Sequence, residues 1–124
     1  MKRKRDYKKR WLKDKANPIK MAYIKKYSIV YRDKMRNKVF DHYGRLCRCC
    51  GEKNIEFLTI DHVNNDGYKF KTRNGKRIGG IGMHLKIIKD GFPKIYQVLC
   101  MNCNWGRRFN GICPHKVLKN RLSN

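Results

Sequence analysis

Acidic residues are scarce in this chain: 9 Asp and Glu stand against 32 Lys and Arg, and the formal net charge is +23. A charge of this size opposes compaction and suits a polyanionic partner. Solubility alone needs only a few units of net charge, so the need for a soluble surface does not explain a net charge of this size. The composition therefore favours a protein that binds nucleic acid.

Long apolar runs are also missing from the sequence. The basic N-terminus is not followed by the apolar core that a secretory signal contains, and no run approaches the length of a transmembrane helix. The aromatic residues are scattered, and no basic stretch separates an apolar face cleanly from a charged one. We therefore expect an intracellular protein, in the cytoplasm, nucleoid or nucleus, without a membrane partner.

Prolines number only three, and the first of them divides an N-terminal basic arm that we assign to residues 1–40. Asn17-Pro18 should end a first helix, because the residue before proline avoids the helical region. A second helix is expected from Ile19 to His42, with an apolar and tyrosine stripe that packs on the core. The residues expected to bind phosphates without sequence preference are Lys2, Arg3, Lys4, Arg5, Lys8, Lys9 and Arg10.

Six cysteines are present, and four of them form two Cys-x-x-Cys pairs. In a reducing compartment such pairs favour a metal over disulfides, and two of them complete a tetrahedral zinc site. The expected structural zinc ligands are Cys47, Cys50, Cys100 and Cys103. Cys49 lies inside the first turn and could replace Cys50 as a ligand. Cys113 and His115 are interpreted as packing and tail residues.

Two short apolar segments, both between the first and the second cysteine pair, predict strands. The first is 55–60, which leads into Asp61-His62, and the second is 96–99, which leads into the second cysteine pair. Residues 68–80 predict a loop. A short helix is expected over 82–90 with Leu85, Ile87 and Ile88 facing inward, and another over 104–109 that ends at Gly111.

The order of these motifs resembles the HNH endonuclease family, especially its small zinc-binding members from bacteriophages and large DNA viruses. The resemblance covers roughly residues 41–115. It rests on three stretches: Phe57-Leu58-Thr59-Ile60-Asp61-His62-Val63-Asn64-Asn65-Asp66-Gly67, Gln97-Val98-Leu99-Cys100-Met101-Asn102-Cys103-Asn104 and Gly111-Ile112-Cys113-Pro114-His115.

The resemblance implies a small α+β fold, in which the four-cysteine zinc site stabilises a ββα-metal unit over residues 41–116. Basic N-terminal helices precede this unit, and a short basic tail, 117–124, follows it. The implied function is hydrolysis of DNA phosphodiester bonds, by nicking or by double-strand cutting, and no small-molecule substrate is expected.

The resemblance also implies roles for individual residues. His62 would be the general base, and Asp61 and Asn104 would hold a catalytic Mg²⁺ or Mn²⁺, since hard ions suit oxygen ligands. Asp61 and His62 are neighbours on a strand, so they should point to opposite sides of it. Arg107 and Arg108 could clamp phosphate.

One position departs from the family pattern. The asparagine that usually orients the base histidine would fall near Ile95, and Asn64, Asn65 or Asn102 could serve instead. The alternative function is therefore a zinc-ribbon protein that binds nucleic acid without hydrolysing it, in transcription, packaging or ribonucleoprotein assembly.

Overall fold

The computed structural model describes residues 6–123, and the chain forms two compact units, residues 1–34 and 35–124. Four of the arm residues expected to bind phosphates, Lys2, Arg3, Lys4 and Arg5, lie outside the described residues. The helix α2 runs from the first unit into the second, so its last turns belong to the same unit as the cysteines.

The first unit holds α1 (Tyr7–Lys15) and the greater part of α2 (Pro18–Tyr43), as the sequence predicted. Side chains cap both helices: Asp6 accepts a hydrogen bond from the Lys9 amide at 3.0 Å, and Asn17 accepts one from the Lys20 amide at 3.1 Å. Such caps satisfy amides that have no partner within the helix.

The tyrosine stripe of α2 does not form a core. Tyr27 is 63 % exposed, and its ring stacks on that of Tyr31 with the centroids 6.5 Å apart. Within α2, buried residues begin only at Val39 and Phe40. The prediction that the whole stripe packs on a core was therefore wrong: periodicity identifies a helix face but not the partner that covers it.

A two-stranded antiparallel sheet is the centre of the second unit. It consists of β1 (Leu58–His62) and β2 (Tyr96–Cys100), with Asp61 opposite Gln97 and His62 opposite Tyr96. The strand β1 starts later than the predicted 55–60, because residues 55–57 form a 3-10 turn, η1 (Ile55–Phe57). The Asn54 side chain caps this turn by accepting a hydrogen bond from the Glu56 amide at 3.1 Å.

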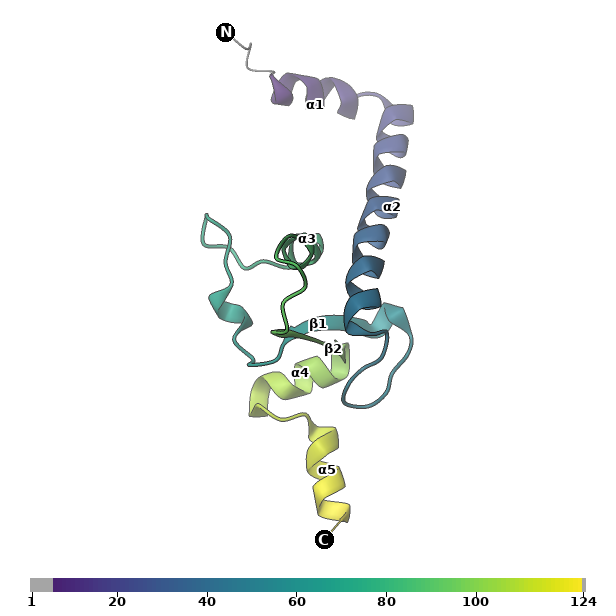
Figure 1. Ribbon diagram of the computed structural model, residues 1–124. Helices are drawn as coiled ribbons and strands as arrows, with labels where there is room; N and C mark the ends of the chain where they lie inside the picture. The colour runs from purple at the N-terminus through teal and green to yellow at the C-terminus, as the bar shows by residue number, and fades with distance from the viewer. Residues whose placement is uncertain (1–5, 124) are drawn as a thin grey trace. The chain divides into compact units, whose positions relative to one another are not determined.

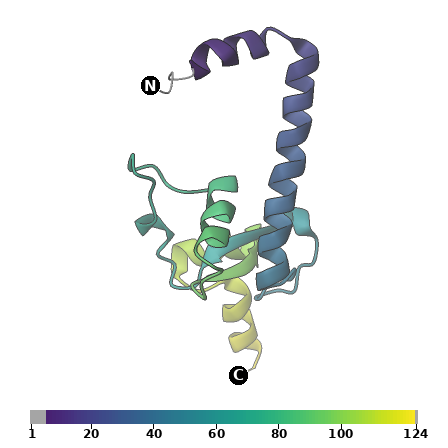
Figure 2. The ribbon, with the colours of Figure 1, turned by 45° about the horizontal axis from the view of Figure 1, so that its top comes forward.

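Helices cover both faces of this sheet (Figures 1 and 2). On one face, the end of α2 and the helix α3 (Ile81–Lys89) bury Val39, Ile87 and Tyr96 together. The helix α4 (Met101–Asn110) packs on the other face. Ile87 is fully buried as predicted, whereas Leu85 is 39 % exposed, so its predicted inward orientation was wrong.

Two features of the C-terminal part differ from the expected pattern. The helix α4 begins at Met101 and not at Asn104, so Cys100 is its N-cap and Cys103 lies in its first turn. The helix stops at Gly111, whose φ of 69° is left-handed, as expected of a helix stop. The expected tail instead forms a helix, α5 (Pro114–Leu122), which contacts α4.

The loop between β1 and α3 carries one short 3-10 turn, η2 (Gly67–Lys69), and a bridge between Lys71 and Arg77. The second unit is thus a small α+β arrangement around a cluster of cysteines. Along residues 6–123, none of the helices combines the length and apolarity needed to cross a membrane.

Replacing Phe40 with alanine should lower the free energy of unfolding by about 3–5 kcal/mol, because the ring is only 1 % exposed and its loss leaves a cavity. Tyr27→Ala, on the exposed part of the same helix, is the matched control and should change it by no more than about 0.5 kcal/mol. Urea unfolding followed by circular dichroism measures both; equal midpoints for the two variants would contradict this packing.

Candidate functional site

Four cysteines from the two sequence-distant pairs converge in the second unit. The sulfur atoms of Cys47, Cys50, Cys100 and Cys103 all lie within 4.8 Å of one another. The sulfur atoms of Cys50 and Cys100, which belong to different pairs, are 3.6 Å apart. A tetrahedral zinc ion with bonds of about 2.3 Å separates its sulfur ligands by about 3.8 Å. This group is therefore positioned to bind a metal ion and is compatible with zinc.

Backbone hydrogen bonds shape the first cysteine turn. The amide of Cys47 donates to the carbonyl of Glu52 at 2.9 Å, and the amide of Gly51 donates to the carbonyl of Cys47 at 3.0 Å. Gly51 has a φ of +82°, which a residue with a side chain rarely adopts. The amide of Arg48 donates to the carbonyl of Val98 at 3.0 Å, which ties the turn to β2.

The electrostatics of the cluster favour a thiolate at Cys47. Burial by itself raises the pKa of this thiol, but hydrogen bonds from neighbouring backbone N–H groups, chiefly those of Cys50 and Cys100, outweigh burial and lower the pKa to about 6. Burial raises the pKa of Cys103, and neighbouring thiols raise it further. A bound metal cation would lower the pKa of Cys103 again, because the thiolate is the form that binds a metal.

Asp61 lies on the face of the sheet that α4 covers, and it is only 9 % exposed. Its Oδ2 atom accepts hydrogen bonds from Gln97 at 3.0 Å and from Arg107, which also forms an ion pair with it. Arg107 donates further to the carbonyls of His62, at 3.0 Å, and Val63. The arginine predicted to clamp phosphate thus holds Asp61 and the end of β1.

Asn104 lies on the same face of the sheet, one turn of α4 before Arg107. Its amide nitrogen donates to the Thr59 hydroxyl at 2.9 Å, and that hydroxyl donates to the carbonyl of Leu99 at 2.9 Å. Asn104 and Asp61 therefore both lie between β1 and α4. Thr59 binds the Asn104 side chain, whereas Gln97 and Arg107 bind the Asp61 carboxylate.

His62 lies on the opposite face of β1, as the alternation of a strand requires. The residue is 6 % exposed. Its ring stacks on that of Phe70, with the centroids 4.5 Å apart, and meets the tilted ring of Tyr96 at 4.9 Å. Within residues 6–123, its Nε2 atom has no hydrogen-bond partner. The structure brings Asp61 and Asn104 to one face and leaves His62 on the other.

Burial lowers the pKa of His62, and the nearby carboxylates of Asp66 and Asp61 oppose this only in part. The neutral imidazole, which can accept a proton, is therefore favoured near pH 7. Gly67 touches the ring: a Cβ added there would lie 2.8 Å from Nδ1. Aromatic packing and this glycine hold the ring, and a backbone hydrogen bond from Val63 to the carbonyl of Ile95, at 2.9 Å, fixes the end of the strand.

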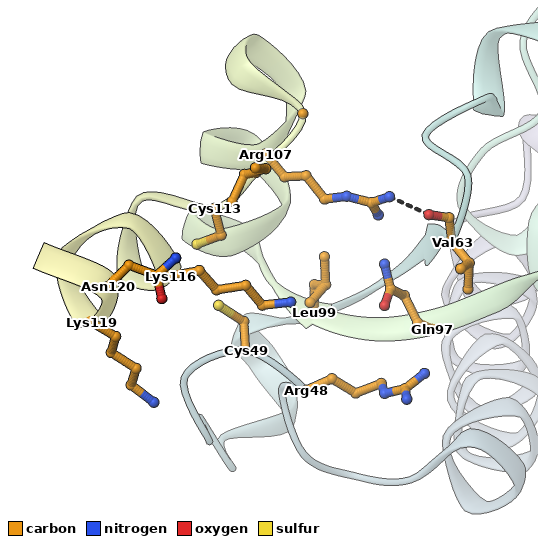
Figure 3. Close-up of a pocket in the computed structure, with 12 residues that line it drawn as sticks. Arg48, Cys49, Val63, Gln97, Leu99, Arg107, Cys113, Lys116, Lys119 and Asn120 are labelled. Atoms are coloured by element: carbon orange, nitrogen blue, oxygen red, sulfur yellow. Dashed lines mark hydrogen bonds between the residues drawn. The ribbon is translucent and has the colours of Figure 1, made fainter. Parts of the chain in front are cut away.

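A basic cavity of about 720 Å³ adjoins Asp61 (Figure 3). Gln97 and Arg107, which both bind the Asp61 carboxylate, form part of its wall. In Figure 3, Arg48 from the first cysteine turn and Arg107 from α4 approach from opposite sides. The cationic residues that line the cavity are Arg48, Arg107, Lys116 and Lys119.

Sequence reasoning missed Lys116, Lys119 and Arg48 as members of this surface. The two lysines stand three apart, which on a helix places them on one side. No helix was expected here, because the domain was predicted to end at residue 116 and a tail to follow at 117–124. Of the other predicted phosphate-binding residues, Lys8, Lys9 and Arg10 are exposed on α1, and Arg108 lies over the Trp105 ring at 5.6 Å.

No family model, curated protein or solved structure matches this chain.

Removal of a metal ion bound by the four cysteines should unfold the second unit, since a two-stranded sheet with a small core is marginal alone. Cys100→Ser should abolish metal binding by this group, and a strong chelator should reduce the helical circular dichroism of the wild type. Elemental analysis measures the zinc-to-protein ratio. Met101→Leu, at the exposed neighbouring position, is the control and should keep the wild-type ratio. Full retention of zinc in Cys100→Ser would rule this site out.

The pKa of His62 should lie below the ordinary value of about 6.5, and Phe70→Ala should raise it, because the largest cause of the shift is burial. Since the folded pKa is the lower one, His62 stabilises the fold fully above about pH 6.5, and this contribution is lost as the pH falls through the folded pKa. An NMR titration of the ring protons measures both values. A wild-type pKa above 6.5 would contradict the buried, neutral ring.

Proposed function

We propose that this protein is a metal-dependent endonuclease of the HNH type that hydrolyses DNA phosphodiester bonds. The observation that carries the proposal is the buried Asp61 carboxylate, held by Arg107 and Gln97 at the wall of a cavity lined by cations. The order of β1, β2 and α4 around this carboxylate is compatible with a ββα-metal unit. The net charge of +23 suits a DNA partner.

Asp61 and Asn104 are the residues that would hold Mg²⁺ or Mn²⁺, because both bring oxygen atoms to the α4 side of β1. A divalent ion there would supply Lewis-acid stabilisation of the charge that develops on the phosphate. Arg107 has two tasks in this proposal. It orients the carboxylate in the free protein through their ion pair, and it turns its guanidinium towards the phosphate when DNA binds.

His62 is the proposed general base. Its Nε2 atom is unpartnered and its pKa is lowered by burial, so the ring is ready to accept the proton of an attacking water. The Phe70 ring covers it, and this residue belongs to the loop between β1 and α3. Binding of DNA must therefore displace this part of the loop before the ring meets the substrate.

The phosphate backbone is bound in this proposal by two groups of cations. One group lines the cavity beside Asp61, and the other lies on the arm, where Lys8, Lys9 and Arg10 are exposed. Contacts of this kind give affinity and position without reading sequence.

The second candidate is a zinc protein that binds nucleic acid without cleaving it. Two contacts favour it: the Asp61 carboxylate is already neutralised by Arg107, and the base histidine is covered by Phe70. Both candidates require the cations, so only a test of cleavage separates them.

Supercoiled plasmid incubated with the zinc-loaded protein and Mg²⁺ or Mn²⁺ should be nicked or linearised. His62→Ala should lower the rate by about 10² to 10⁴, the usual effect of losing a general base, with unchanged DNA affinity. Asp61→Ala should raise the metal concentration needed for half-maximal rate, because it removes the anionic ligand.

The chain supplies its own controls, since Asp41-His42 is a second Asp–His pair, at the end of α2, with both residues exposed. Asp41→Ala and His42→Ala should leave the cleavage rate within a few-fold of the wild type. If wild type and His62→Ala leave plasmid equally intact while still binding it, the nuclease proposal fails for that DNA and the binding protein takes its place.

A further inference from the structure

We propose that the chain holds a second zinc ion, bound by Cys49, Cys103, Cys113 and His115, and that Cys103 bridges it to the first. The sequence pattern favoured packing roles for Cys113 and His115. In the structure, the sulfur atoms of the three cysteines and a ring nitrogen of His115 all lie within 4.8 Å of one another. This inference is independent of the proposed nuclease activity.

The position of His115 is the strongest geometric support. Its Nδ1 atom lies 3.3 Å from the sulfur of Cys103 and 3.4 Å from that of Cys113. A tetrahedral zinc ion separates a nitrogen and a sulfur ligand by about 3.6 Å, from bonds of about 2.0–2.1 and 2.3 Å. A ring nitrogen carries a single proton or a single lone pair, so it makes one strong hydrogen bond. Convergence on two sulfurs is better explained by a shared cation.

The adjacent cysteines of the first turn supply one ligand to each ion. Cys50 belongs to the group with Cys47 and Cys100, whereas Cys49 belongs to the group with Cys113 and His115. Cys103 is the member common to both groups and is fully buried between them. Figure 3 shows the sulfur atoms of Cys49 and Cys113 facing each other at the end of the basic cavity.

A close backbone approach brings the last two ligands to Cys103. Gly111 ends α4 in a left-handed conformation, and the chain then turns into α5 with Cys113 at its N-cap. A Cβ atom added at Gly106 would lie 2.7 Å from Cδ of Pro114, so the glycine permits the contact between α4 and the residue that separates Cys113 from His115. Gly106 thus helps to position Cys113 and His115, although it binds no ion itself.

The surroundings suit the charge of such a cluster. Two zinc ions with six thiolates and a neutral imidazole carry a net charge of about −2, because the six thiolates outweigh the charge of the two ions. Arg48, Lys116 and Lys119 line the same cavity as Cys49 and Cys113, so cations lie beside the second group. Nearby lysine and arginine side chains stabilise thiolates.

The test is the zinc content of the full chain, purified under reducing conditions, loaded with zinc alone and desalted. Native mass spectrometry and elemental analysis should both give two ions per wild-type chain. Cys113→Ser and His115→Ala should each give one, with circular dichroism unchanged because the first site remains. The control His42→Ala, at an exposed histidine of the same unit, should keep two.

Gly106→Ala removes no ligand and should still lower the second ion's occupancy, because the added methyl group pushes Pro114 away. Cadmium-113 NMR of the cadmium-loaded wild type should show two resonances coupled through the sulfur of Cys103. Each of three outcomes overturns the proposal: one ion in the wild type, a disulfide between Cys49 and Cys113, or two ions retained in both Cys113→Ser and His115→Ala.

Discussion

The convergence of cysteine sulfurs on Cys103 is the constraint on which the second unit depends. The sheet has two strands of five residues each, and its fully buried side chains are few. A two-stranded sheet is marginal in water without further support. The cluster joins the turn at Cys47, the end of β2 and the start of α4, and it also fixes where α4 begins. Asn104 and Arg107 face Thr59 and Asp61 because of that starting point.

The same arrangement sets a geometric condition on any chemistry at this unit. Asp61 and His62 are adjacent in sequence, but the pleat of β1 sends them to opposite faces. Each face then has its own environment: hydrogen bonds from Arg107 and Gln97 hold the carboxylate, whereas aromatic rings enclose the imidazole. A group that contacts both must lie beyond the end of the strand, where Val63 and the following loop begin. The conformation of that loop therefore matters more than the distance between the two side chains.

Local spacing allowed much of this structure to be predicted. The two helices of the arm, the strand at 96–99 and the stop at Gly111 depend on nearby residues, and all are present. The four-cysteine group joins two pairs that are distant in the sequence, but the two-residue spacing inside each pair predicted it, because one tetrahedral ion needs both pairs. Other features depend on contacts between distant segments, which spacing does not report. The pairing of Arg107 with Asp61 and the stacking of Phe70 on His62 are of this kind. The helix α5 was missed because its sequence is basic and carries only a weak apolar stripe.

The order of the ligands along the chain has a consequence for biosynthesis. Cys47 and Cys50 leave the ribosome first, Cys100 and Cys103 follow, and Cys113 and His115 emerge last. The first cysteine turn is therefore outside the ribosome before the ligands that complete either group, since chains emerge and begin to fold from the N-terminus. A chain that ends shortly before Pro114 would keep all four cysteines of the first group. It would lack Cys113 and His115 and so leave the Cys49 thiol without two of its partners.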